Sequence, residues 1–159
     1  MKRHEPLYLA QSAMIAALYV SLTIISNMLG LWEIRFSEAL CILPYFTAAA
    51  VPGLTIGCVL SNLLTGCAAW DVVFGSFATF AGAYLARKLS KKSWIFAPWP
   101  NIVSNTLIVP LILRYVYFDT SRTLTGLFVY MAASEIVSAG VLGYILLHAL
   151  KKHERIFQL

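Results

Sequence analysis

Residues 39–70, ALCILPYFTAAAVPGLTIGCVLSNLLTGCAAW, run for 32 residues without a charged side chain. One helix needs only ~20 apolar residues to cross the hydrocarbon core of a bilayer, so this stretch is too long for a single span. Its middle carries AVPG at residues 50–53, which is a turn signal. We therefore divide the stretch into two helices, near residues 37–51 and 53–69.

Further charge-free stretches occupy much of the remaining chain, at Leu7–Trp32, Val72–Ala86, Ser93–Leu113 and Ile136–Leu150. They lack the strict apolar–polar alternation of transmembrane strands. The pattern predicts an all-α integral membrane bundle of six transmembrane helices, near 7–31, 37–51, 53–69, 71–86, 93–113 and 124–150. Six helices of ~20 residues need about 120 residues. We therefore expect residues 1–159 to form a single membrane domain.

The composition supports a membrane protein. Hydrophobic residues make up 60% of the chain and charged residues 12%, with a mean hydropathy of +0.77. A soluble domain has roughly 45–50% apolar and about 25% charged residues. So few charges cannot form a water-facing surface. This excludes an ordinary soluble enzyme, a disordered chain and a nucleic-acid-binding protein, and it makes membrane lipid the expected surrounding.

Lysine and arginine are distributed unevenly. With the N-terminus inside, the inner segments hold nine of them and the outer loops hold three, namely Arg35, Arg114 and Arg122. The positive-inside rule then predicts a multi-pass protein of a plasma membrane with both termini in the cytoplasm. The nine inner residues are Lys2, Arg3, Arg87, Lys88, Lys91, Lys92, Lys151, Lys152 and Arg155.

Motifs for catalysis and for nucleotide binding are missing from the sequence. It has no phosphate-binding G-x-x-x-x-G-K-[ST] loop, no H-E-x-x-H and no G-x-S-x-G, and its three cysteines have no metal-ligand spacing. We expect no enzymatic activity, no cofactor and no metal in this chain. If ATP drives transport, another subunit must hydrolyse it.

Polar residues inside the apolar stretches are the candidate binding residues, because an ionisable group in hydrocarbon costs ~2.5–3.5 kcal/mol or more. Glu135 lies about eleven residues into the last predicted helix, near mid-membrane at ~1.5 Å per residue. Glu38 and Asp71 open two other predicted helices, and Asn105 shares a helix face with Asn101. The carboxylates form an acidic group that opens outward, which suits a cationic or donor-rich solute.

Structural interpretations remain open for several of these residues. Asn62 and Asn101 are also typical of polar contacts between membrane helices. Glu38 and Asp71 also fit helix N-caps or partners of Arg35. Trp70 fits either a ring that stacks on a ligand or an interfacial aromatic belt.

Small residues line one face of the first predicted helix at Ala10, Ala13 and Ala17. Such a stripe lets another helix approach closely. Similar stripes occur at Gly53 and Gly57 and on the later helices, at Gly75, Ala78, Gly82, Ala139 and Gly143. We expect most of them to serve internal packing and at least one to face a partner. The sequence does not decide which.

Several blocks of sequence together resemble the QueT family, the substrate-binding S-components of energy-coupling factor (ECF) transporters. The resemblance covers roughly residues 7–150, and its more specific parts are RFSEAL at 35–40 and DVVFGS at 71–76. Other matching blocks are AMIAALYV at 13–20, VPGL at 51–54, SNL at 61–63 and SEI at 134–136.

The resemblance implies a six-helix prokaryotic membrane protein that captures a micronutrient from outside and topples to release it. It implies a complex with a membrane coupling subunit, which would meet the A-x-x-x-A element at Ala13 and Ala17, and with two ATPases. The implied substrate is a queuosine precursor, either queuine or a related 7-deazaguanine.

For this ligand, donor–acceptor matching suggests a role for each candidate residue. Glu135 or Asp71 would bind the base edge and Glu38 the amine. Asn105 would bind the carbonyl and Trp70 would stack on the ring, while Arg35 also lies at the expected ligand position.

Three alternatives stay open. The chain resembles an S-component, and such a component could bind another micronutrient, because a fold does not determine a ligand. A membrane-embedded enzyme would need a nucleophile or a metal, and neither is evident. A self-sufficient secondary transporter often shows inverted repeats, and we find none.

Overall fold

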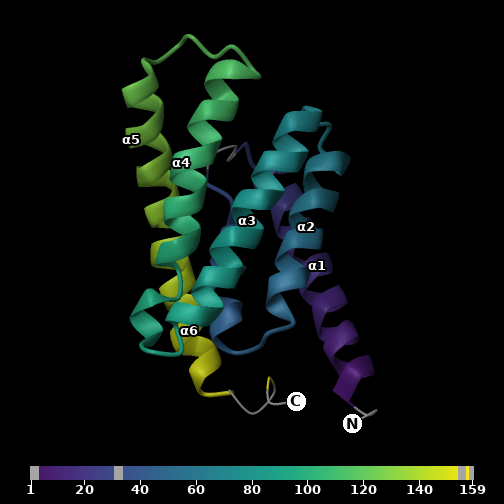
Figure 1. The fold of residues 1–159 in the computed structure, drawn as a ribbon. Coiled ribbons are helices and arrows are strands. Elements are labelled where there is room, and N and C mark those ends of the chain that lie inside the picture. The colour runs from purple at the N-terminus through teal and green to yellow at the C-terminus, as the bar shows by residue number, and fades with distance from the viewer. Residues whose placement is uncertain (1–3, 31–33, 154–156, 158–159) are drawn as a thin grey trace.

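The computed structural model describes residues 4–30, 34–153 and 157, and every element in these ranges is helical. The prediction of an all-α bundle is therefore confirmed (Figure 1). The elements are α1 (His4–Met28), η1 (Phe36–Tyr45), α2 (Ala50–Leu64), α3 (Ala69–Leu89), η2 (Trp94–Phe96), α4 (Trp99–Tyr115), α5 (Leu124–Glu135), η3 (Ile136–Val141) and α6 (Leu142–Lys151).

Four helical segments of the described chain are long and apolar enough to cross a membrane: Glu5–Met28, Ala69–Leu89, Trp94–Tyr115 and Leu124–Lys151. The last of these combines α5, η3 and α6. The expected six full spans are not supported, because η1 and α2 are shorter. A ten-residue 3₁₀-helix such as η1 rises only ~20 Å, whereas the hydrocarbon core of a bilayer is ~30 Å thick.

Helix η1 is a central core element rather than a spanning helix, so the predicted span at 37–51 is wrong. It packs against α1, α2, α3, η3 and α6, and seven of its ten residues are buried. Hydropathy on all sides is typical of a helix enclosed by protein as well as of one in lipid. Its last turn contains Pro44, and the Arg87 guanidinium donates to the carbonyl oxygens of Pro44 and Tyr45 at 2.9 and 3.0 Å.

The break in the long apolar stretch lies earlier than predicted, between Tyr45 and Ala50. Pro52 is instead the third residue of α2. Proline is tolerated in this first turn, because a backbone N–H there has no acceptor inside the helix and proline lacks that group. Gly53 serves helix packing. A Cβ atom there would lie 2.8 Å from the carbonyl oxygen of Ser12 on α1.

The small-residue stripes fall into internal and external ones. A Cβ on Gly57 would lie 2.7 Å from the Cβ of Tyr19, and one on Gly82 would lie 2.5 Å from Oδ1 of Asn101. These glycines therefore allow close contact of α2 with α1 and of α3 with α4. By contrast, the stripe on α1 is exposed at Ala10, Ala13 and Ala17.

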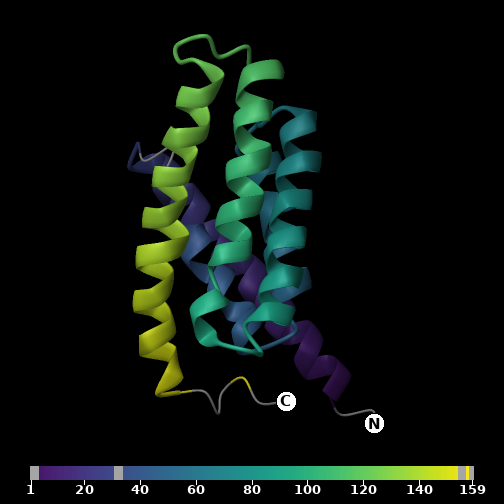
Figure 2. The ribbon, with the colours of Figure 1, turned by 60° about the vertical axis from the view of Figure 1, so that its left-hand side comes forward.

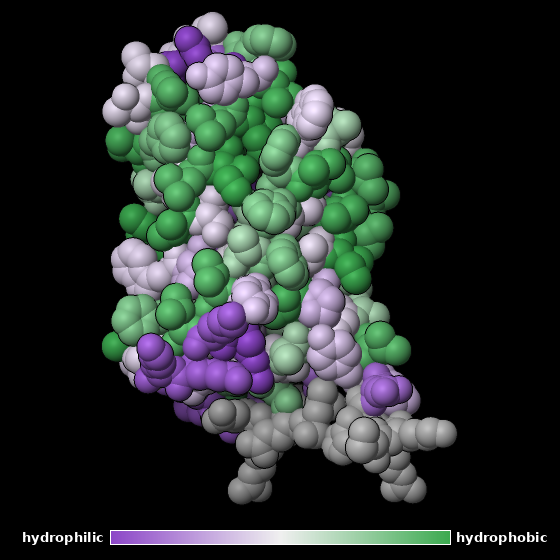
Figure 3. All heavy atoms as spheres, viewed as in Figure 1, coloured by the Kyte–Doolittle hydropathy of each residue, from purple (hydrophilic) through white to green (hydrophobic). Residues whose placement is uncertain are grey.

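The bundle has two distinct ends. Both ends of the described chain lie at one of them, here called the terminal end, together with the turn between α3 and α4 (Figures 1 and 2). The opposite, loop end carries the α2–α3 and α4–α5 loops. Apolar residues cover most of the middle, and hydrophilic residues gather toward the terminal end (Figure 3). Lys2, Arg3 and Arg155 of the predicted inner set lie outside the described residues.

Candidate functional site

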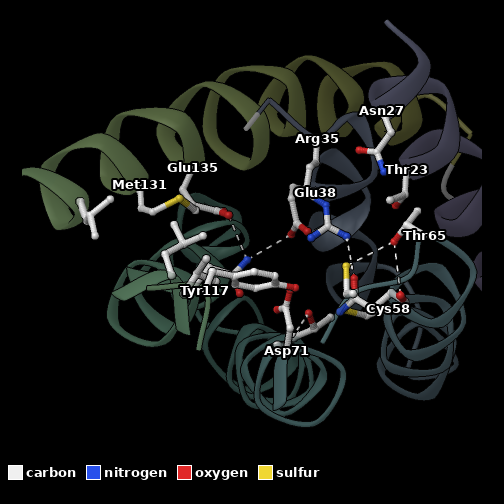
Figure 4. A pocket seen from close by; sticks show the side chains of 18 of the residues that line it. Thr23, Asn27, Arg35, Glu38, Cys58, Thr65, Asp71, Tyr117, Met131 and Glu135 are labelled. Atoms are coloured by element: carbon white, nitrogen blue, oxygen red, sulfur yellow. Dashed lines mark hydrogen bonds between the residues drawn. The ribbon is translucent and has the colours of Figure 1, made fainter. Parts of the chain in front are cut away.

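A pocket of about 420 Å³ lies inside the half of the bundle nearest the loop end. Its walls come from α1, η1, α2, α3, α4 and α5 and from the loops that join them at this end (Figure 4). Pockets for small molecules are typically ~300–1,000 Å³. The volume therefore fits a ligand of that class.

The short central helix explains why a pocket exists here. The described wall contains one residue of η1, Glu38, which lies in the first turn of that helix. The rest of η1 extends toward the terminal end, where Arg87 contacts its last carbonyls. None of the described helices fills the space beyond the N-terminal end of η1, so this space is left open between the surrounding helices.

Five of the six predicted ligand-binding residues line this pocket, although they are far apart in the sequence: Arg35, Glu38, Asp71, Asn105 and Glu135. Trp70 is the exception. Its side chain is 60% exposed and its ring stacks on Phe74, with the ring centroids 5.8 Å apart. The structure thus does not bring Trp70 to the pocket.

Glu38 is surrounded by donors from the core. Its Oε1 accepts a hydrogen bond of 2.6 Å from the Tyr19 hydroxyl. Its Oε2 accepts from the side-chain amides of Asn101 and Asn105 at 2.8 and 3.4 Å, and from the Cys41 thiol at 3.3 Å. Only 2% of the residue is exposed. These partners are side chains, so Glu38 does not act as an interfacial N-cap.

Glu135 has far fewer partners. Its Oε1 accepts from the Asn105 amide at 3.0 Å, while its Oε2 is buried and has no hydrogen-bond partner among the described residues (Figure 4). The residue is 5% exposed. A buried carboxyl oxygen without a donor carries a desolvation cost that a hydrogen bond would offset. A bound molecule with an N–H or O–H group would supply that donor.

Arg35 adds a cationic group to the same wall. Its Nη2 lies 3.5 Å from Oδ1 of Asn62, and its Nε has no partner among the described residues. Asn62 is therefore a pocket residue and not only a helix–helix contact. The pocket can bind an acceptor atom at Arg35 as well as a donor at Glu135.

Tyr117 and Asp71 meet where the pocket opens toward the loop end. The Tyr117 hydroxyl donates to Oδ2 of Asp71 at 3.1 Å and accepts from the Ala68 backbone N–H at 2.9 Å. Partial burial, with the charge and hydrogen bond of Asp71, raises the pKa of Tyr117 to about 12, although the Ala68 N–H lowers it. This hydroxyl thus remains a donor at neutral pH.

A family model described as "QueT transporter" matches residues 9–152 of the chain, nearly its whole length. The chain belongs to the QueT transporter family. No curated protein and no solved structure matched it in the corresponding searches. Because the family is one of transporters, the alternative of a membrane-embedded enzyme loses its support. The apolar helices of this family member fit a place in a membrane.

Other residues that line the pocket were not predicted as ligand-binding residues from sequence. Arg122 lies over the ring of Tyr130, 4.1 Å from its centroid, and both residues line the wall. Met131 also lines it, and helical spacing places this residue on the face of Glu135, one turn earlier, although it was not predicted as a ligand-binding residue. Arg122 lies in a loop, where no periodicity indicates direction. Among the described residues, no three His, Cys, Asp or Glu side chains could together hold a metal ion.

Proposed function

We propose that this chain is the substrate-binding subunit of an ECF-type importer for a queuosine precursor, either queuine or a related 7-deazaguanine. The observation that carries the proposal is the unpartnered Oε2 of Glu135 on the wall of a pocket of small-molecule size. A 7-deazaguanine presents a ring N–H and an exocyclic amine on one edge. A carboxyl group can accept hydrogen bonds from both.

The charges on the wall support a cationic ligand. Glu38, Asp71, Asp119 and Glu135 outnumber Arg35 and Arg122 there. Queuine and its aminomethyl precursor carry an ammonium group. We assign the base edge to Glu135, the ammonium group to Asp71 near the mouth and a ring acceptor, such as the carbonyl oxygen, to Arg35.

The exposed face of α1 supports the proposed partner. Ala10, Ala13 and Ala17 leave a shallow strip on the outside of the bundle, where a helix of a membrane coupling subunit can pack closely. The sequence has no phosphate-binding loop, so the proposed complex needs ATPase subunits, of which ECF transporters have two.

We also propose that residues 1–159 form one domain in a prokaryotic plasma membrane, with both termini in the cytoplasm. The end of α3, the turn that follows it and the end of α6 lie toward the terminal end (Figure 1). These segments carry Arg87, Lys88, Lys91, Lys92, Lys151 and Lys152, so the positive-inside rule assigns this end to the cytoplasm. The pocket would then open toward the outside, as capture of an external nutrient requires.

The test is ligand identification followed by titration. Mass spectrometry of the detergent-purified protein would identify a retained molecule, and calorimetry would measure binding of queuine and 7-aminomethyl-7-deazaguanine. Glu135→Gln should weaken binding roughly 10- to 100-fold, because a hydrogen bond to a charged group is lost. Glu5→Gln, an exposed site on α1, is the matched control and should bind like the unchanged protein.

Other outcomes would point to the alternatives. Tight binding of a different vitamin, with no binding of either deazaguanine, would replace the proposed substrate. Uptake into proteoliposomes by this chain alone would replace the ECF complex with a secondary transporter.

A further inference from the structure

The two glutamates of the pocket wall have opposite hydrogen-bonding environments. Both oxygens of Glu38 accept from protein donors, whereas Oε2 of Glu135 has no partner among the described residues. Both side chains are at least nine-tenths buried, with 2% and 5% of their surfaces exposed. The difference therefore does not come from contact with solvent.

We propose that Glu135 alone binds the donor edge of the ligand, and that Glu38 and Asn105 are positioning residues that do not touch it. This inference rests on the proposed function for the identity of the ligand. It replaces the expectation from sequence that Glu38 binds an amine and that Asn105 binds a carbonyl.

Both oxygens of Glu38 already accept hydrogen bonds from protein donors. A carboxylate offers about four lone-pair directions. Oε2 accepts from three donors, the Cys41 thiol and the amides of Asn101 and Asn105, and Oε1 accepts from the Tyr19 hydroxyl at 2.6 Å. An ammonium group that binds at Oε2 would have to displace one of its three donors, which would then be buried without this acceptor.

Asn105 connects the two glutamates. Its side-chain nitrogen lies 3.4 Å from Oε2 of Glu38 and 3.0 Å from Oε1 of Glu135, as the dashed lines in Figure 4 show. An amide nitrogen has two N–H donors, and here each has a carboxyl acceptor. Glu38, held by Tyr19 on α1 and Asn101 on α4, thus fixes Asn105, and Asn105 fixes the orientation of Glu135.

The experiment compares two ligands that differ by one donor group, 7-deazaguanine and 7-deazahypoxanthine, which lacks the exocyclic amine. A residue that binds the donor edge sets the preference between them, whereas a positioning residue weakens both alike. Glu135→Gln should reduce the preference for 7-deazaguanine about tenfold. Glu38→Gln should weaken both ligands by the same factor and leave the preference unchanged.

A second measurement needs no ligand. Glu38→Gln places an NH₂ group among the donors of Tyr19, Asn101 and Asn105, so the free protein should unfold on the order of 5 °C lower. Glu135→Gln changes one contact and should shift unfolding by less than half of that. Glu5→Gln is the control in both assays.

Two results would overturn the inference: an equal change of ligand preference in both glutamine variants, or greater thermal destabilisation by Glu135→Gln. If Glu38→Gln does not fold, Tyr19→Phe removes one Glu38 donor and should weaken both ligands equally. If the unchanged protein binds neither ligand but binds another micronutrient, the proposed substrate fails. The ligand-free unfolding comparison then decides the roles of the two glutamates.

Discussion

The hydroxyl of Tyr117 donates a 3.1 Å hydrogen bond to Oδ2 of Asp71, and so joins the loop after α4 to the first turn of α3. The same hydroxyl accepts from the backbone N–H of Ala68, the N-cap of α3, so one oxygen atom makes two hydrogen bonds to the start of this helix. Both side chains line the pocket at its loop end. A ligand that leaves through this end would pass close to this connection.

Tyr117→Phe should therefore speed ligand release. This hydrogen bond to the Asp71 carboxylate is exposed to solvent, so we expect it to contribute about 0.5–1.5 kcal/mol, which corresponds to roughly a two- to tenfold faster dissociation rate when it is removed. Stopped-flow displacement of bound queuine would measure the rate. Tyr115→Phe is the matched control, because Tyr115 is 66% exposed and does not belong to the pocket wall. Equal dissociation rates in both variants would show that the connection does not hinder release.

The raised pKa of Tyr117 predicts a pH dependence of stability. Its ordinary value is 10.0 and its value in the fold is about 12, mainly because partial burial disfavours the phenolate. Between these pH values the unfolded chain loses the Tyr117 proton, whereas the native protein keeps it. The contribution of Tyr117 to the free energy of unfolding is therefore complete below pH 10 and is lost as the pH rises toward 12. The unfolding temperature of the unchanged protein should fall more steeply above pH 10 than that of Tyr117→Phe. Parallel curves for the two proteins would contradict this assignment.

Much of the candidate site was predictable because an ionisable side chain inside a membrane helix carries a free-energy cost. Carboxylates inside predicted membrane helices need a reason, and this argument identified Glu38 and Glu135. Trp70, predicted to stack on the ligand, does not line the pocket, and the reason is geometric. Adjacent residues on a helix point about 100° apart, and here Asp71 lines the pocket whereas the Trp70 ring is exposed and stacks on Phe74.

The errors in the fold have a common cause. Hydropathy does not distinguish a helix enclosed by other helices from one surrounded by lipid, so the segment of η1 was predicted as a span. The π-helical turn at Ile136–Val141, directly after Glu135, was also unforeseen. Such turns depend on tertiary packing and are frequent at functional sites.

Close packing of α2 on α1 predicts that Gly57→Ala destabilises the protein. The new Cβ would lie 2.7 Å from the Cβ of Tyr19, which also holds Glu38. Overpacking of this kind costs about 1–3 kcal/mol, and ligand affinity should fall with it. Gly140→Ala is the control, since its Cβ would meet the nearest atom, Cδ1 of Ile102, at 3.7 Å. Thermal unfolding of both variants would test this prediction. Equal unfolding temperatures would show that α1 and α2 accommodate the added methyl group without loss of stability.

Cysteine labelling should report on occupancy of the pocket. Cys58 and Cys67 both line the wall, but Cys58 is 2% exposed whereas Cys67 is half-buried in the loop after α2. A small maleimide should thus modify Cys67 first, and bound queuine should slow the reaction several-fold. Mass spectrometry would count the modifications. Cys67→Ser should abolish the fast reaction and Cys58→Ser should keep it. An unchanged rate with saturating queuine would place the ligand elsewhere.

The exposed stripe on α1 predicts a variant that binds substrate but does not transport it. Ala13→Leu and Ala17→Leu add bulk to an outward-facing surface, so neither the pocket nor the core is disturbed. A coupling-subunit helix packed on this stripe could no longer approach closely, because small residues are what allow such an approach. We expect binding of queuine within twofold of the unchanged protein, together with loss of ATP-dependent uptake in proteoliposomes that contain the full ECF complex.

Ala133→Leu is the matched control, because Ala133 is an exposed alanine on α5, outside the α1 stripe. It should retain both binding and uptake. Co-purification of the coupling subunit separates assembly from transport: the two α1 variants should recover less of it than Ala133→Leu does. Full recovery and full uptake with both α1 variants would move the partner surface to another face of the bundle. That result would not affect the ligand-binding proposal, because the α1 stripe lies on the outside of the bundle whereas Glu135 lines the pocket inside it.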